Sequence, residues 1–183
     1  MKDNGAVAIL EISSIAKGIE ASDAMCKSAG VTLSKSAPMP RGKYLIVVAG
    51  PVGEVESAMK AGMDMAADTV LAHFIIRNVH GQVVKAFEKK VPAEILEAVG
   101  VIETREAAPA VFAADAAVKA AAVHLIEIRA GAGVGGKGYI TLTGEVGAVR
   151  TAISAGVKAV PEGMLVSRIV IPFAHEHLKK ALF

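Results

Sequence analysis

The stretch that decides the fold is "AVAILEISSIAKGIEASDAMCKSAGVTL", Ala6 to Leu33. It returns 92 residues later as "AVGVIETREAAPAVFAADAAVKAAAVHL", Ala98 to Leu125. Five matches outside alanine carry the similarity: Glu11, Asp23, Lys27, Val31 and Leu33 recur as Glu103, Asp115, Lys119, Val123 and Leu125. Self-similarity at a fixed spacing is the signature of repeated structural units. The sequence therefore predicts that one unit occurs twice.

The repeat continues beyond this stretch with a small change of spacing. "GKYLIVVAGPVGEVESAMKAG", Gly42 to Gly62, matches "GKGYITLTGEVGAVRTAISAG", Gly136 to Gly156, and "FIIRNVH" ending at His80 matches "IVIPFAH" ending at His175. The offset grows from 92 to 94 across one loop, so the second copy has two more residues there. We predict two tandem domains, residues 1–91 and 92–183, joined near "EKKVPAEILEA".

Each copy is expected to alternate strands and helices in one order. In the first copy we expect strands at 6–12, 31–35, 43–49 and 70–76, and helices that begin after Ser13 or Ser14, at Pro51 and near His80. The first helix is expected to bury the stripe Ile15, Ile19, Ser22, Cys26 and Ala29 and to end by Gly30; the second is expected to carry Val52, Val55 and Met59. The order β-α-β-β-α-β is the ferredoxin-like pattern of the α/β (α+β) class, an antiparallel four-stranded sheet with helices on one face.

Composition excludes several classes of function. Hydrophobic residues make up 53% of the 183 positions but aromatic ones only 4%, which favours thin layers that pack closely, also against further copies of the chain. No apolar window is long enough for a membrane helix, and the start of the chain does not read as a secretory signal. A single cysteine fits a reducing cytosol, and a net charge of +2 without a basic cluster argues against nucleic acid as a partner.

The glycine-rich stretch "GAGVGGKG", Gly131 to Gly138, resembles a phosphate-binding loop. It satisfies both G-x-G-x-x-G and G-x-x-x-x-G-K, but glycine stands where such a loop needs Ser or Thr for magnesium. Both motifs work because a helix follows and points its amides at phosphate, whereas "YITLTG" is typical of a strand. We therefore interpret these glycines as a connection between two strands.

No catalytic or metal-binding group is evident. Cys26 falls on the expected apolar stripe, which predicts a small buried side chain rather than a reactive thiol. The five histidines lack metal-ligand spacing, and Glu11 and Glu103 have no neighbouring acid or base. The sequence predicts a protein that is not an enzyme and holds no metal.

The repeated segments, with "GKYLIVVAGPVGEVESAM" and the closing "IVIPFAH", resemble bacterial microcompartment shell proteins over nearly the whole chain, from about Ala6 to His175. Two unpermuted units in one chain are similar to the tandem-domain class, such as the T-type shell proteins of propanediol utilisation. The resemblance implies a structural homotrimer whose six domains mimic a hexamer. Such a trimer tiles with other shell proteins into a cytoplasmic shell, which encloses enzymes and admits small metabolites.

The family also implies roles for particular segments. Its turns between the second and third strands surround a central pore, which here assigns Ser36, Ala37, Pro38, Met39, Pro40, Arg41, Ala130, Gly131, Ala132, Gly133, Val134 and Gly135 to the pore lining. Its tile edges assign contacts with neighbouring tiles to Lys27, Lys119, Asn78, His80, Phe173 and His175. The arginine that the family often carries in Pro-Arg-Pro-His is absent from the matching place in both copies.

One cofactor is weighed on this resemblance. T-type relatives hold an iron-sulfur cluster on the threefold axis through a loop cysteine before a proline, whereas here the dipeptide is Met39-Pro40. A thioether does not replace a thiolate, so we expect no cofactor. Arg41 either gives the pore a preference for anions or is an ordinary surface charge. A ferredoxin-like sensor of small molecules and a redox shell protein stay as alternative functions.

Overall fold

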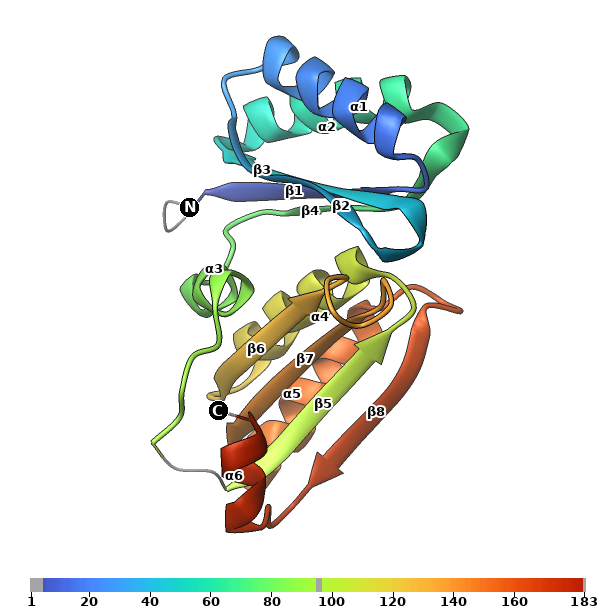
Figure 1. Ribbon diagram of the computed structural model, residues 1–183. Helices are drawn as coiled ribbons and strands as arrows, with labels where there is room; N and C mark the ends of the chain where they lie inside the picture. The colour runs from blue at the N-terminus through green and yellow to red at the C-terminus, as the bar shows by residue number, and fades with distance from the viewer. Residues whose placement is uncertain (1–4, 95–96, 183) are drawn as a thin grey trace. The chain divides into compact units, whose positions relative to one another are not determined.

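The computed structural model describes residues 5–94 and 97–182, which fall into two compact units (Figure 1). Unit 1 comprises 5–79 together with the turn 131–136, and unit 2 comprises the remaining described residues from His80 onward. The division of the sequence into domains 1–91 and 92–183 stays a prediction. No helix in the described ranges combines the length and the apolar character that crossing a membrane requires.

Unit 1 has the predicted order of strands and helices. It contains β1 (Ala6–Ile12), α1 (Ile15–Ser28), β2 (Thr32–Met39), β3 (Lys43–Gly50), α2 (Val52–Ala66) and β4 (Val70–Ile76), with short 3-10 turns at Pro40–Gly42 and Ala67–Thr69. The strands form an antiparallel sheet in the order β2-β3-β1-β4. Figure 1 shows both helices on one face of this sheet. The predicted fold class is confirmed.

Unit 2 repeats this arrangement. It contains α3 (Gly81–Glu88), β5 (Ala98–Thr104), α4 (Ala107–Ala120), β6 (His124–Ala130), β7 (Gly138–Gly144), α5 (Val146–Ala159), β8 (Leu165–Ile171) and α6 (Glu176–Leu182). Its sheet has the order β6-β7-β5-β8. Even the irregularity of the edge strand recurs, because the register shifts at Leu33/Lys35 in one copy and at Leu125/Glu127 in the other.

Helices α1 and α4 lie close to their sheets, and the two contacts are packed in different ways. A Cβ on Gly18 of α1 would overlap the ring of Tyr44 on β3, so the glycine makes room for the tyrosine. In unit 2 the sizes are reversed: Ala110 stands on the helix, and a Cβ on Gly138 of β7 would lie 2.6 Å from it. Each pair fills the same space with one larger and one smaller residue, as close packing requires.

Of the apolar stripe predicted for α1, Ser22 is buried and Ala29 is half-buried, but the three larger side chains are exposed. Ile15 is 41% and Ile19 57% exposed, and Cys26 is exposed as well. The face that α1 buries contains Gly18, Ala21 and Met25 beside Ser22. Two faces of this helix fit a helical period, and the one with small residues packs on the sheet because it allows a close approach. Ser14 does cap α1, since its side chain accepts from the Lys17 amide at 3.3 Å.

Strand β2 is longer than the sequence indicates. We expected it to end at Lys35, but it pairs with β3 as far as Met39, opposite Lys43. Proline at position 38 did not stop it, because this strand lies at the edge of the sheet, where a missing amide donor is tolerated. Four of the six residues expected in the first pore loop therefore lie in a strand.

Candidate functional site

The first expected pore segment ends in a tight turn. After Met39 the chain passes through Pro40–Gly42, where Arg41 adopts φ 69° and ψ 24° with its side chain exposed. Met39 itself is only 7% exposed. Its sulfur packs on the backbone of Gly131 within unit 1, since a Cβ on that glycine would overlap it. The assignment of these residues to a pore stays a prediction.

The second expected pore segment is a glycine turn. Ala130 is the last residue of β6, and the chain then turns through Gly131, Gly133 and Gly135 at φ of 82°, 75° and 65°. The Gly136 amide closes the turn by donating to the Gly131 carbonyl at 3.1 Å. These positive φ values favour glycine, which explains the glycine-rich sequence without a nucleotide.

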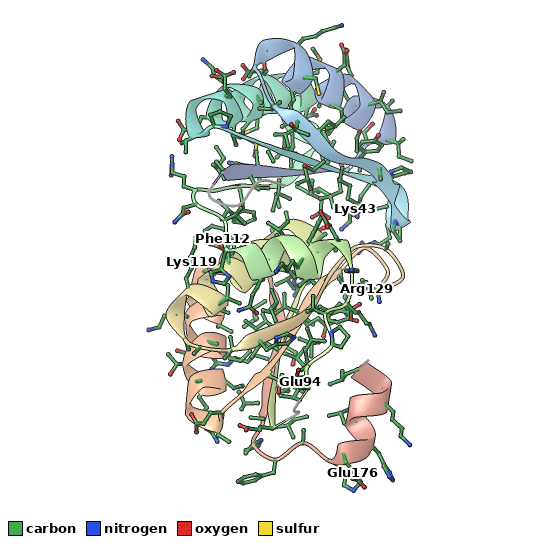
Figure 2. The ribbon with its side chains drawn as sticks, turned by 90° about the vertical axis from the view of Figure 1, so that its left-hand side faces the viewer. Lys43, Glu94, Phe112, Lys119, Arg129 and Glu176 are labelled. Atoms are coloured by element: carbon green, nitrogen blue, oxygen red, sulfur yellow. The ribbon has the colours of Figure 1, made fainter. Side chains whose placement is uncertain are left out.

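A buried ion pair lies beside this turn in unit 1. Lys43, labelled in Figure 2, donates from Nζ to Glu11 Oε1 at 3.0 Å and to the Gly136 carbonyl oxygen at 3.0 Å. The side chains of Lys43 and Glu11 are 6% and 0% exposed. Sequence reasoning noticed the glutamate but did not pair it with the lysine. The available signal was that both residue types recur at matching places in the two copies.

The matching pair in unit 2 is much more exposed. Lys137 Nζ lies 2.8 Å from Glu103 Oε1, with side-chain exposures of 48% and 33%. Lys137 and Glu103 occupy the repeat positions of Lys43 and Glu11, as the alignments at offsets 94 and 92 show. The ion pair is thus conserved between the copies, while its burial is not.

The two lysines assigned to tile edges make the same contact within their helices. Lys27 lies 2.6 Å from Asp23 on α1, and Lys119, labelled on α4 in Figure 2, lies 2.5 Å from Asp115. The Asp23 side chain is 61% exposed, whereas that of Asp115 is 7% exposed. Contacts of either lysine with a neighbouring tile stay a prediction.

Helix α3 explains why Asp115 is buried. The His80 amide donates to Asp115 Oδ1 at 2.9 Å, and His80 Nδ1 accepts from the Gln82 amide at 3.3 Å. The Gln82 side chain then donates to the Val123 carbonyl at 3.0 Å and accepts from the Leu125 amide at 2.8 Å. The start of α3 is therefore fixed to α4 and to the edge strand β6 of unit 2.

Helix α6 follows β8 as α3 follows β4, and a histidine caps its start as His80 caps α3. The His177 amide donates to His175 Nδ1 at 3.2 Å, which matches the cap that His80 gives α3. Both His175 and His177 are exposed, and Phe173 is 89% exposed. Asn78, the remaining tile-edge residue, is exposed at φ 53°. Within unit 2, Asp115 contacts both the His80 amide and Lys119.

Unit 2 also contains a polar cluster around the buried Glu127. Arg129, labelled in Figure 2, and Tyr139 bond to its two carboxylate oxygens at 2.5 Å and 2.9 Å. The negative charge of Glu127 raises the pKa of Arg129, and burial raises the pKa of Tyr139. Both shifts favour the usual protonated forms, a charged Arg129 and a neutral Tyr139.

One surface hollow of about 330 Å³ lies between α5 and β8. Its lining residues are Arg150, Ile153, Ser154, Arg168, Ile169 and Val170. Sequence reasoning did not single these residues out. Within the described ranges, no group of three or more His, Cys, Asp or Glu side chains is placed to hold a metal ion.

Comparison with known proteins gives one consistent family. The model of the BMC domain matches twice, at residues 6–79 and 98–174. The bacterial microcompartment shell protein PduT of Citrobacter freundii is 40% identical over 174 residues, which cover 94% of this chain and 95% of that protein. The carboxysome shell protein CsoS1 of Prochlorococcus marinus is 42% identical over 90 residues, 46% of this chain and 82% of that protein.

Solved structures agree with the sequence comparison. A crystal structure of a microcompartment protein from Desulfitobacterium hafniense DCB has a TM-score of 0.84 and 46% identity, covering 96% of this chain and 98% of the other. A fused permuted hexameric shell protein, MSM0275 of the RMM microcompartment, shares the fold with a TM-score of 0.67, 24% identity and coverage of 87% and 86%. With two BMC domains in tandem, the chain belongs to the bacterial microcompartment shell proteins.

Proposed function

We propose that three copies of this chain close head to tail into a ring of six modules, which serves as a tile of a microcompartment shell and carries an axial pore. MSM0275, which shares the fold, is a fused hexameric shell protein, and three chains of two modules would supply the same six positions. The role is structural, and we propose that the chain has no catalytic activity of its own.

The observation that carries this proposal is that equivalent surfaces of the two units differ in burial. On the first helix, Ile19 is 57% exposed in unit 1, while its repeat counterpart Val111 is 3% exposed. On the face of the sheet away from the helices, unit 1 is the more buried: Ile9 is fully buried, while its counterpart Val101 in unit 2 is half-buried. Each unit thus leaves apolar surface open that its counterpart buries.

Two different open surfaces on one chain favour a head-to-tail interface. Such an interface joins unlike patches, and it closes into a ring when the rotation between copies allows it. Helix α1 of one copy would then cover the open sheet face of unit 2 in the next copy, where Ile169 is 46% exposed. Leu33 on β2 is also 41% exposed although its counterpart Leu125 is buried. In unit 2, helix α3 is attached to the edge strand β6. Because α6 is the repeat counterpart of α3 and β2 that of β6, we propose that α6 of another copy covers Leu33.

The expected pore follows from the ring. Three turns of each kind, Pro40–Gly42 and Gly131–Gly135, would face the axis, and three exposed Arg41 side chains would give the opening positive charge. We expect no iron-sulfur cluster there, because Met39 offers a buried thioether. The tile-edge residues Lys27, Lys119, Asn78, His80, Phe173 and His175 would meet other shell proteins at the rim.

The experiment that tests the proposal is a measurement of molecular mass in solution followed by electron microscopy. Three chains of 18.8 kDa give a particle of about 56 kDa. We expect this mass by light scattering at micromolar concentration, and flat sheets or closed shells on co-expression with other shell proteins. A stable monomer of 18.8 kDa would contradict the ring, and a trimer that never joins sheets or shells would contradict the tile.

A further inference from the structure

The two copies of the lysine–glutamate pair differ in one respect that points to a second chain. The side chains of Lys43 and Glu11 are buried, whereas those of Lys137 and Glu103 are 48% and 33% exposed. The positions are nevertheless equivalent, because each glutamate lies on β1 or β5 and each lysine begins β3 or directly precedes β7. An exposed ion pair contributes little to stability. The stability of the single chain therefore does not explain why the second copy retains both Lys137 and Glu103.

The turn at Gly136 is what closes over the buried pair. Its carbonyl oxygen accepts from Lys43 Nζ at 3.0 Å. A Cβ added to Gly136 would lie 3.4 Å from Lys43 Nζ and 3.2 Å from the Pro40 carbonyl oxygen, so bare backbone packs on the lysine. The residue adopts φ 82°, a left-handed backbone that favours glycine.

The counterpart of Gly136 in the repeat is Gly42, and it has nothing to cover. Gly42 adopts the same kind of backbone, with φ 72°, but a Cβ added to it would meet nothing within 4 Å. Among the described residues of unit 2, Lys137 has no backbone carbonyl packed on it as Lys43 does. In the described part of unit 1, the Gly42 turn has no lysine packed beneath it as the Gly136 turn does. Lys137 has one described partner, Glu103, which leaves donor hydrogens on its ammonium group.

We propose that the Gly42 carbonyl of a second copy accepts a hydrogen bond from Lys137, and that its turn Pro40–Gly42 seals the Lys137–Glu103 pair from water. This inference rests on the proposed ring and adds one of its joints. The same pair is then buried in both copies: in unit 1 within the folded chain, and in unit 2 within the contact between chains.

Burial makes such a pair sensitive to the loss of one partner. Removing a single charge leaves the other buried and unpaired, which is strongly destabilising, while replacing both by apolar residues of similar size is often neutral. Glu103→Gln should therefore weaken the trimer, and the double variant Glu103→Leu/Lys137→Met should recover much of the loss. The same single substitution should hardly affect the isolated chain, where the pair is exposed.

Dilution of the trimer, followed by mass photometry, tests the inference. We expect Glu103→Gln to raise the concentration of half-dissociation by about tenfold or more. The matched control is Glu56→Gln, which breaks the exposed pair of Glu56 with Arg77 and should leave that concentration unchanged. Urea unfolding of the diluted chains verifies that each variant still folds.

A second variant addresses the carbonyl itself. Gly42→Asn keeps a residue that tolerates the left-handed backbone but places a side chain beside the carbonyl, so we expect it to weaken the trimer as well. Gly163→Asn, at φ 76°, with open space around it and outside the proposed pore, is the control and should leave the trimer unchanged. If the wild type is a trimer and Glu103→Gln dissociates at the same concentration, the proposed contact between Lys137 and Gly42 is wrong, but the proposed ring is not contradicted. If the wild type is a monomer, the ring itself is wrong.

Discussion

Helices α1 and α4 hold the same place in their units, yet they present different surfaces. Every residue of α4 that matches the exposed apolar face of α1 is buried: Val111 stands for Ile19, and Val118, which is 7% exposed, stands for Cys26. The exposed positions of α1 are therefore those that the second copy shows to be suited to burial. In a repeated chain, one unit indicates what the other needs from a partner.

The largest expected effect comes from changing the buried member of this comparison. Val111→Asp places a carboxylate where the side chain is 3% exposed, and burying a charge without a partner is costly. We expect the free energy of unfolding to fall by at least about 3 kcal/mol, as measured by urea denaturation. Unfolding like that of the wild type would mean that this face of α4 is not part of the folded core.

The exposed member should respond in assembly instead. Ile19→Asp is expected to raise the dissociation constant of the trimer by about a hundredfold or more, because the same carboxylate would be buried between chains. Urea denaturation of the chain itself should hardly change. The matched control is Val52→Asp on α2, where Val52 is 40% exposed and its counterpart Val146 is not fully buried. Equal dissociation of both variants would remove α1 from the interface.

The smallest effect concerns the thiol on the same face. Cys26 is exposed in the single chain, but its counterpart Val118 is buried, so the ring should cover it. We expect a maleimide to label Cys26 in the Ile19→Asp monomer about tenfold or more faster than in the wild-type trimer, since reaction requires access to the thiol. Equal labelling rates at concentrations where the wild type is trimeric would place Cys26 outside the interface.

The order of the elements could be predicted from the sequence because it depends on local patterns. Strand β4 begins and ends at the predicted residues, Val70 and Ile76, and Ser14 caps α1 as its position before an apolar run suggests. Because the sequence contains the unit twice, two stretches of sequence supported the same order of elements. These signals lie within a few residues of each other, so they need no knowledge of distant contacts.

The buried face of α1 could not be read in this way. Its periodicity fits the stripe through Ile15 and Ile19 as well as the face with Gly18, and the larger apolar side chains favoured the wrong one. The choice is made by Tyr44, which lies 26 positions after Gly18 and packs on it. Hydrophobicity favoured the face that the proposed ring would bury, not the face that a single chain buries.

The ion pairs escaped prediction for a related reason. Lys43 reaches Glu11 only because β1 and β3 pair antiparallel with Glu11 opposite Leu45, two residues from Lys43. That register is a tertiary fact, and Lys43 without it reads as an ordinary strand-end lysine. The burial of the pair depends further on Gly136, which lies 93 positions away.

The unequal lengths of the two turns carry a consequence for how such a ring can change. The short turn Pro40–Gly42 and the longer turn Gly131–Gly136 are encoded separately in the duplicated chain, so they can change independently at the centre of the proposed ring. In a ring of six identical modules, every substitution at the opening would appear six times. In the proposed ring each would appear three times, so one turn could acquire charge or bulk while the other kept the proposed pore open.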